Sequence, residues 1–303
     1  MTTFAGVLPV VPTPFSEYVS VDHYSMGNVF SYEIDCGISS LVYPGVASED
    51  IQLSVEERAA CVQTVTDSAA GKITVIGGVN SPDAEEMVSL SAFMKEQGVD
   101  GIMAMAVPSM AKKGFVHWFH AISEATGGLP IVLQNLFAPR GANLSAAEML
   151  ELSRNVNAIR YVKEEAIPSG PKVSAVVAGM GDALDGVIGG GGARYVFEEL
   201  ERGVVATMPA IELLELHVAL MEAYATGRRE DALALYERSV PLLLMQAPYR
   251  MRLTKLILKH RGIIKTDLVR EDLPELDDIS RALVLEMYQA LSQGSEAAVA
   301  WTH

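Results

Sequence analysis

Short apolar runs alternate with amphipathic stretches along most of the chain. Eight of these runs are rich in β-branched and aliphatic residues and predict buried strands. They cover residues 7–11, 38–43, 73–76, 102–107, 131–133, 158–163, 184–188 and 204–207. Turn-forming pairs such as Pro44-Gly45 and Gly77-Gly78 follow two of the runs directly.

The stretches between the runs predict helices. They cover residues 21–35, 54–69, 82–97, 115–125, 171–179 and 193–201, and one more helix is expected to begin at Ser145, with Glu148 three residues on. Ser54 and Glu57 have the spacing of a capping box, which marks a helix start. Ser81 is expected to cap the third helix with Pro82 at its first position, and Gly98 to end it.

Strands that alternate with helices predict a parallel sheet, and eight is the number of strands that closes a barrel. We therefore predict an α/β fold, a (β/α)8 TIM barrel, over residues 1–210. From residue 211 the strand pattern stops, and helices are expected at 230–244, 250–260 and 279–291. Residues 211–303 are predicted to hold the last barrel helix and a C-terminal helical extension of the same domain.

Composition narrows the possible partners. The 303 residues are 50% hydrophobic, enough for one large core, and the formal net charge of −15 repels phosphate backbones, so we expect no nucleic-acid partner. Cys36 and Cys61 are too few for a disulfide framework and suit a reducing, cytoplasmic setting. Neither a signal-like N-terminus nor an apolar run of about 18 residues occurs, so we expect a soluble protein without a membrane partner.

Lys163, Glu164 and Glu165 stand at the carboxyl end of a predicted strand, where barrel enzymes carry their active sites. Side chains alternate along a strand, so Tyr161, Lys163 and Glu165 share one face and Glu164 points away. In isolation such charges usually lie exposed at a strand end. However, Lys163 is the only basic residue at any predicted strand end except Arg140, which lies further out in a loop. An amine inside an apolar barrel loses its proton more readily and can then attack a carbonyl carbon to form a Schiff base.

Two other features invite a functional reading. The glycines at 189–192 resemble a phosphate loop but lack the spacing of known nucleotide motifs, so a close backbone approach near the substrate or a tight turn before Ala193 is the simpler reading. His117 and His120 lie three apart on a predicted helix, without a carboxylate at a matching spacing. We therefore expect no metal site there.

Together these segments resemble the dihydrodipicolinate synthase and N-acetylneuraminate lyase superfamily of Schiff-base lyases, over nearly the whole chain. The matching segments are 6–15, 45–49 with the Glu56-Glu57-Arg58 helix, 161–164 and 203–209. The resemblance implies that Lys163 forms the Schiff base with a small 2-keto acid. It also implies that no metal or organic cofactor is needed, and that the chain assembles as a homotetramer, a dimer of dimers.

The strand-two turn departs from the family pattern. Most members have Gly-Thr-Thr-Gly-Glu where this chain has Gly45-Val46-Ala47-Ser48-Glu49, so the threonine hydroxyls that usually hold the keto-acid carboxylate are missing. We expect Gly45, Ala47 and Ser48 to bind the substrate instead, through the backbone N–H groups of Ala47 and Ser48 and the Ser48 hydroxyl. Glu49 is expected to brace backbone amides rather than touch substrate.

A second departure favours one branch of the superfamily. Gln134 stands where most members have the catalytic tyrosine required for aldol cleavage and for the synthase reaction, and Arg140 is displaced by about one position from the synthase's carboxylate-binding arginine. The 2-keto-3-deoxy sugar acid dehydratases, notably the L-2-keto-3-deoxyarabonate type, are similar in carrying the residues found here as Ser48-Glu49, Gln134, Tyr161 and Glu165.

This resemblance implies a hydro-lyase. Lys163 would condense with the C2 carbonyl, Glu165 would take a proton from C3, and Gln134 would orient a substrate hydroxyl. Two alternatives remain open: a synthase-like or N-acetylneuraminate lyase-like aldolase that condenses or releases pyruvate, and a barrel without activity that binds a keto acid.

Overall fold

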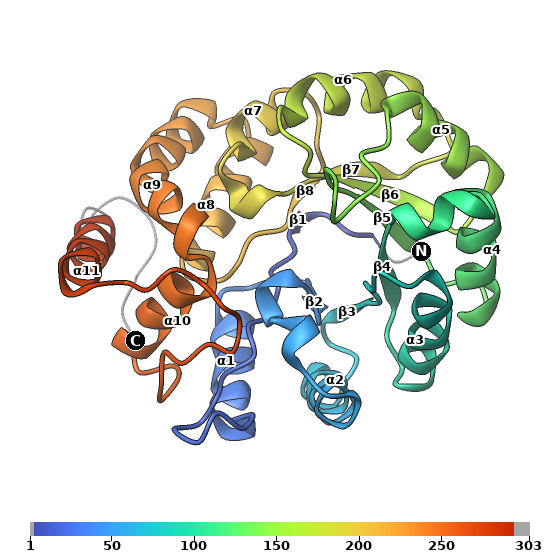
Figure 1. Ribbon diagram of the computed structural model, residues 1–303. Coiled ribbons are helices and arrows are strands. Elements are labelled where there is room, and N and C mark those ends of the chain that lie inside the picture. The colour runs from blue at the N-terminus through green and yellow to red at the C-terminus, as the bar shows by residue number, and fades with distance from the viewer. Residues whose placement is uncertain (1–2, 294–303) are drawn as a thin grey trace.

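The computed structural model describes residues 3–293 and has the predicted barrel at its centre. The eight parallel strands are ordered β1-β8-β7-β6-β5-β4-β3-β2. In Figure 1 they lie at the centre of a ring of helices. The strands are β1 Gly6–Val7, β2 Ser40–Tyr43, β3 Thr74–Gly78, β4 Gly101–Met105, β5 Ile131–Asn135, β6 Ile159–Glu164, β7 Gly186–Gly189 and β8 Ala206–Thr207.

Hydrogen bonds beyond β1 bring the two ends of the sheet together. β1 pairs with β8, and past its end the Val42 N–H of β2 donates to the Pro9 carbonyl at 2.9 Å. The Val11 N–H donates to the Val42 carbonyl at 3.1 Å. The first strand is shorter than the predicted 7–11 because Pro9 has no N–H to donate to a regular ladder.

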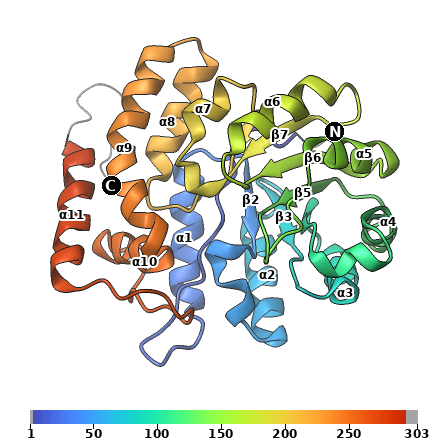
Figure 2. The same ribbon diagram turned by 45° about the horizontal axis from the view of Figure 1, so that its top comes forward.

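Helices follow the strands in chain order. They are α1 His23–Asp35, α2 Val55–Ala69, α3 Ala84–Glu96, α4 Phe115–Ala125, α5 Ala146–Asn155, α6 Ser169–Gly179, α7 Val196–Leu200 and α8 Leu214–Ala225. The C-terminal extension consists of α9 Arg229–Tyr249, α10 Met251–His260 and α11 Asp278–Gln293, which lie together on one side of the barrel (Figures 1 and 2). The last part of the predicted extension, residues 294–303, lies outside the described residues.

Four predicted helix starts are wrong by two or three residues, and two of these are α1, which begins at His23 rather than 21, and α6, which begins at Ser169 rather than 171. α3 begins at Ala84 with Asp83 as its cap, because the Ser81 hydroxyl instead accepts the Asp83 N–H in the preceding turn. α7 begins at Val196 rather than 193, since Ala193 has a φ of +61° that a right-handed helix excludes. The capping boxes at Ser54 and Ser145 are confirmed.

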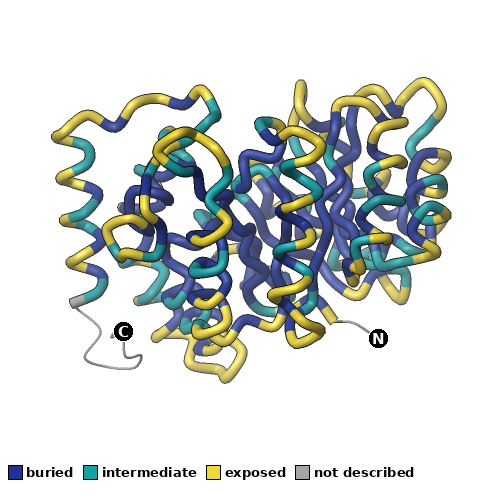
Figure 3. The backbone as a smooth tube through the Cα atoms, turned by 90° about the horizontal axis from the view of Figure 1, so that it is seen from below, coloured by how far each residue is buried: buried dark blue, intermediate teal, exposed yellow. Residues whose placement is uncertain are grey.

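The core forms inside and outside the barrel wall. Side chains such as Phe4, Leu8, Ile76, Met103 and Tyr161 fill the interior. A larger cluster separates the strands from the helices, and a third joins α8 to the extension. In Figure 3 the strands are buried while the outward faces of the helices are exposed. In the described part of the chain, no helix is both long and apolar enough to cross a membrane.

Candidate active site

Lys163 lies near the carboxyl end of β6 and faces a cavity of about 310 Å³ at the mouth of the barrel. Its side chain is only 6% exposed, and its Nζ lies 3.2 Å from the Oε1 of Glu165. The predicted alternation of side chains therefore brings these two groups together at the floor of the cavity. A buried amine paired with one carboxylate can transfer its proton without bulk water.

The Glu165 carboxylate accepts further hydrogen bonds. Gln134 Nε2 of β5 donates to Oε2 at 2.5 Å, and the Gly191 N–H donates to Oε1 at 3.2 Å. Burial raises the pKa of Glu165, but Lys163, Gln134 and Gly191 together outweigh burial and hold the pKa below its ordinary value. The group is therefore ionised at neutral pH and ready to accept a proton.

Asn80, at the end of β3, fixes the orientation of Gln134. The Met105 backbone N–H donates to Asn80 Oδ1 at 2.8 Å, so the Asn80 Nδ2 must face away from that amide and donates to Gln134 Oε1 at 2.8 Å. The Gln134 NH2 group is then directed at Glu165. The sequence alone gives Asn80 no role, and its role becomes apparent only from its contact with the backbone amide of the neighbouring strand β4.

Glu164 lies on the opposite face of β6, as the alternation predicts. Its oxygens accept hydrogen bonds from Asn135 Nδ2 at 2.7 Å and from the Ala166 N–H at 2.6 Å. Burial raises the pKa of this carboxyl group. Glu164 therefore holds the start of the strand-six loop and does not reach the cavity.

Most polar groups of the turn after strand β2 form hydrogen bonds within the protein. The Ser48 hydroxyl donates to the Val11 carbonyl at 2.5 Å and accepts the Gly45 N–H at 2.9 Å, while the Ser48 N–H donates to the Gly45 carbonyl. Gly45 and Ser48 thus hold the turn. Among the described residues, the N–H groups of Val46 and Ala47 donate to no acceptor, and both residues line the cavity.

Glu49 braces backbone amides, which confirms the prediction for this residue. Its Oε2 accepts the N–H groups of Arg270 and Glu271 at 2.7 and 2.8 Å, and its Oε1 pairs with Lys255 of α10. Burial lowers the pKa of Lys255 to about 8 despite this pairing. Glu49 therefore ties the strand-two turn to the C-terminal extension, away from the cavity.

The glycines after β7 allow the side chains of Glu165 and Glu199 to pack directly against the backbone, which explains these glycines without a phosphate group. A Cβ on Gly190 would lie 2.2 Å from Glu165 Cγ, and one on Gly189 would lie 2.1 Å from Glu199 Oε2. Gly191 and Gly192 have φ values of +60° and +66°, which turn the chain toward α7. The close backbone approach that we predicted is therefore to Glu165.

The outer wall of the cavity is basic. Arg140 follows β5, Arg194 follows the glycine turn, and Arg250 stands between α9 and α10. Arg250 pairs with Glu271 at 2.8 Å, and Arg194 donates to the Gln246 side-chain oxygen at 2.8 Å. The sequence predicted neither Arg194 nor Gln246, because they are brought to the cavity by tertiary packing.

Tyr161 lies below Lys163 on the same face of β6. Its hydroxyl accepts the Phe4 N–H at 3.1 Å, and the two aromatic rings pack with centroids 4.9 Å apart. Tyr161 therefore packs in the barrel interior, and its hydroxyl is held by the N-terminal segment.

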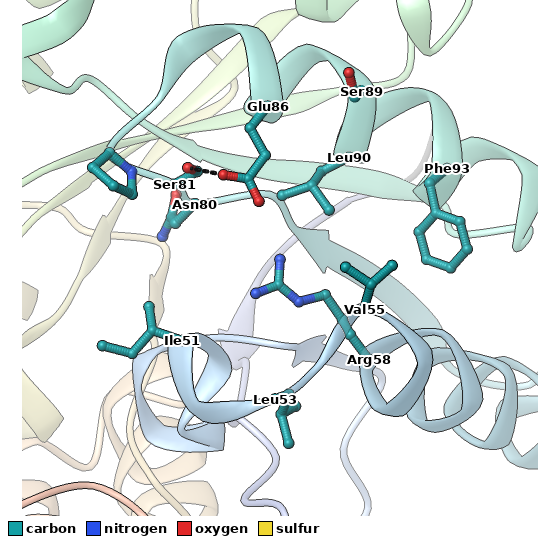
Figure 4. Close-up of a pocket in the computed structure, with 11 residues that line it drawn as sticks. Ile51, Leu53, Val55, Arg58, Asn80, Ser81, Glu86, Ser89, Leu90 and Phe93 are labelled. Carbon is teal, nitrogen blue, oxygen red and sulfur yellow. Dashed lines mark hydrogen bonds between the residues drawn. The ribbon is translucent and has the colours of Figure 1, made fainter.

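A second hollow of about 520 Å³ lies between α2 and α3 (Figure 4). Its walls are mostly apolar, with Arg58 and Glu86 as its charged groups, and Ser81 donates to Glu86 at 2.6 Å. It contains no lysine, cysteine or histidine. The nucleophile and its proton acceptor both belong to the cavity over Lys163, which is therefore the candidate active site.

Comparison with known proteins shows which family the chain resembles over most of its length. A family model described as "Dihydrodipicolinate synthetase family" matches residues 3–291. An L-2-keto-3-deoxyarabonate dehydratase of Azospirillum brasilense is 26% identical over 98% of this chain and 97% of its own length. A 4-hydroxy-tetrahydrodipicolinate synthase of Methanosphaerula palustris is 28% identical over 79% of this chain and 82% of its own.

Solved structures share the fold. A dihydrodipicolinate synthase from Rhodopseudomonas palustris superposes with a TM-score of 0.87 at 22% identity, over 94% of this chain and 97% of that one. A prophage protein of the dihydrodipicolinic acid synthase family from E. coli K12, solved with pyruvate, has a TM-score of 0.84 at 20% identity, over 96% and 99%.

Proposed function

Because the chain belongs to the dihydrodipicolinate synthetase family, we propose that it is a Schiff-base-forming lyase that dehydrates a 2-keto-3-deoxy sugar acid. The observation that carries the proposal is the contact of 3.2 Å between Lys163 Nζ and Glu165 Oε1, with Gln134 on the other carboxylate oxygen. This arrangement supplies a nucleophile and a base on one face of β6. At the end of β5 it supplies an amide, which cannot take a proton from a substrate hydroxyl.

The reaction begins at the lysine. Glu165 takes a proton from the Lys163 ammonium group, the free amine attacks C2 of the keto acid, and loss of the C2 oxygen as water leaves an iminium ion. The positive nitrogen acidifies the C3 hydrogens. Glu165, having passed its first proton to the departing water, removes one of them and leaves an enamine.

The enamine then expels the C4 hydroxyl group. The proton held by Glu165 moves to that oxygen, which leaves as water, and a conjugated iminium ion remains. Addition of water at C2 releases the product and returns the free lysine. Gln134 hydrogen-bonds the Glu165 carboxylate in its ionised form and, once a substrate is bound, orients the C4 hydroxyl toward it.

The strand-two turn holds the keto-acid carboxylate in this proposal. Val46 and Ala47 line the cavity, and we propose that their backbone N–H groups bind the anion, whereas Ser48 acts by closing the turn. Ala47 thus keeps its predicted role, while the contributions of Gly45 and Ser48 are indirect.

Borohydride reduction in the presence of pyruvate tests the first step. It should add the mass of one reduced pyruvate to Lys163, and Lys163→Ala should abolish the adduct. Lys172→Ala, which removes a half-buried lysine of α6 that donates to Asn143, should trap pyruvate like the wild type. An adduct of equal yield in Lys163→Ala would rule out this lysine as the nucleophile.

Mass spectrometry of the products tests the reaction class. Incubation with a panel of 2-keto-3-deoxy aldonates should yield products that are lighter by one water. Release of pyruvate would identify an aldolase instead, and trapping without any turnover would favour a keto-acid-binding barrel.

A further inference from the structure

Arg194 is a cation that the reaction described above does not use. It follows the glycine turn after β7 and lines the same cavity as Lys163. The cavity of about 310 Å³ is at the small end of the range for small-molecule sites, roughly 300–1,000 Å³. A keto acid attached to Lys163 therefore extends to the walls, and the residues there contact its far end.

The guanidinium of Arg194 is held in place by a neutral partner. Its Nη1 donates to Gln246 Oε1 of α9 at 2.8 Å, and Gln246 is itself only 7% exposed. The turn leaves room for this contact, because a Cβ on Gly192 would lie 3.2 Å from that same Nη1. An amide oxygen orients the guanidinium without neutralising its charge, and four of its five N–H donors remain available.

Among the described residues, the acidic groups near the cavity form no salt bridge with Arg194. Asp50 interacts electrostatically with Arg140, Arg58 and Arg250. Glu165 is paired with Lys163 and Glu271 with Arg250. Glu212, which acts on Arg194 only at a distance, is fully buried, accepts a hydrogen bond from Thr254, and has its pKa raised by burial. Within the described part of the chain, Arg194 and Arg140 form no salt bridge.

Arg194 therefore has no paired carboxylate among the described residues, in a protein whose formal net charge is −15. The proposed site of the keto-acid carboxylate is at Val46 and Ala47, which follow β2, whereas Arg194 follows β7. A second anionic group at the far end of the ligand would balance the charge of Arg194. A planar guanidinium with free paired donors binds a carboxylate through two parallel hydrogen bonds.

We propose that Arg194 binds a second carboxylate at the end of the substrate remote from the keto group. The preferred substrates are then 2-keto-3-deoxy dicarboxylates rather than keto acids that end in a neutral hydroxymethyl group. This inference rests on the proposed function, since it takes Lys163 as the attachment point of the ligand.

The test compares ligands of equal length that differ only at the far end. 2-Oxoglutarate and 2-oxopentanoate compete with pyruvate for borohydride trapping on Lys163, which needs no turnover. The wild type should bind 2-oxoglutarate at least 10-fold more tightly. Arg194→Gln should lower the affinity for 2-oxoglutarate by about 10- to 100-fold, the usual effect of losing a charge-assisted hydrogen-bonded pair. It should change the affinity for 2-oxopentanoate by less than about threefold.

A second variant keeps the arginine. Gln246→Glu places a carboxylate against Arg194 and should remove the preference for 2-oxoglutarate while pyruvate trapping continues. Arg154→Gln, which removes an exposed arginine of α5 that donates to Gly179, controls for the loss of one positive charge and should keep the preference.

Turnover should show the same preference. The wild type should favour a 2-keto-3-deoxy aldarate over the aldonate of equal length, and Arg194→Gln should remove this difference mainly by raising KM for the aldarate.

The outcomes separate this inference from the proposed function. The inference is wrong if the wild type prefers 2-oxopentanoate, or if Arg194→Gln lowers the affinity for both ligands equally. Arg194 then does not bind the far end of the substrate. If pyruvate is never trapped, the Schiff-base function fails. Calorimetric titration with the same two keto acids then decides the role of Arg194 alone.

Discussion

Glu165 is the residue on which the choice of reaction depends. Its carboxylate pairs with Lys163 and accepts hydrogen bonds from Gln134 and the Gly191 N–H, and these three partners stabilise the ionised form. Removal of the C3 proton converts the positively charged iminium into a neutral enamine, so the charge that favoured the ionised carboxylate disappears as Glu165 takes up the proton. An aldolase would need a proton acceptor at the C4 hydroxyl instead.

Substitution of Glu165 by Gln separates these possibilities. The variant keeps nearly the same size but cannot accept a proton, so turnover should fall by roughly 10²- to 10⁴-fold. Exchange of the C3 hydrogen with deuterated water should disappear. Pyruvate should still be trapped on Lys163 in a long incubation, because water can then remove the ammonium proton in place of Glu165. Mass spectrometry of the trapped enzyme and NMR of the exchange measure both effects.

The matched control is Glu164→Gln, which changes the adjacent carboxyl group on the outer face of β6. It should retain turnover to within about threefold. Near-wild-type turnover and exchange in Glu165→Gln would show that this residue is only a charge at a strand end.

The residues of the site were predictable to the extent that they follow from strand geometry. Alternation along β6 and the meeting of parallel strand ends predict that Lys163, Glu165 and Gln134 converge, and they do. The role of Asn80 depends on the Met105 N–H of a different strand. The hydroxyl of Ser48 was expected to face substrate, but a hydroxyl this close to the Val11 carbonyl hydrogen-bonds there. Contacts of this kind have no signal in the sequence.

At the scale of elements, α7 carries a buried carboxyl group against β7. Ser169 donates to Glu199 Oε1 at 2.9 Å, whereas Oε2 has no hydrogen-bond partner among the described residues and lies against Gly189. Burial raises the pKa of Glu199 from its ordinary 4.5 to about 7, and the nearby Glu165 adds to the effect. The packing of α7 is therefore sensitive to pH.

The sign of this effect follows from proton linkage. Between pH 4.5 and about 7 the folded protein holds a proton on Glu199 that the unfolded chain has lost, so the contribution to stability falls as the pH rises and is lowest above pH 7. Glu199→Gln mimics the protonated acid. It should raise the free energy of unfolding by about 2–3 kcal/mol at pH 8 and by almost nothing at pH 4.5.

Urea unfolding at the two pH values measures this difference. Glu198→Gln is the control, because that carboxylate is half-exposed on the same helix and pairs with Arg202 at the surface, where an ion pair contributes little. An equal gain for Glu199→Gln at both pH values would show that the carboxyl group is not protonated in the folded protein.

Element boundaries show where local sequence signals end. Ser54 and Ser145 cap their helices as predicted, because a capping box is completed within four residues. α9 continues to Tyr249 through Pro241, beyond the predicted end at residue 244. Its packing against α8, α10 and α11 maintains a helix that local propensity would interrupt.

For the whole molecule, the number and order of the strands were predictable from the alternation of apolar runs with amphipathic stretches. Which apolar side chains lie at the outer surface was not predictable. The run Leu242-Leu243-Leu244-Met245 in the sequence suggests core and interface packing, and an apolar interface would need its side chains at the surface. Leu242 and Leu243 are buried, and Leu244 alone is largely exposed, at 62%. Consecutive residues of a helix point in different directions, so a run of four cannot face one surface.

An apolar surface does occur at the hollow between α2 and α3. Ile51 and Val55 are 59% and 77% exposed there, opposite Leu90 and Phe93 of α3 (Figure 4). Adjacent exposed apolar side chains usually mark an interface between proteins. We therefore predict that the chain assembles through this hollow, and that the assembly is the tetramer that the family resemblance implies.

Light scattering at micromolar concentration should give about four times the chain mass of 32.6 kDa. Val55→Asp should lower that mass because it would bury an unpaired charge in the interface. Tyr18→Ser, which changes a loop side chain that is 91% exposed, should leave the mass unchanged.

Asn80 lines the hollow and also directs Gln134 toward Glu165, so the dissociated variant should lose turnover while still trapping pyruvate on Lys163. A monomeric wild type, or a dissociated variant with full turnover, would contradict this coupling between assembly and the site.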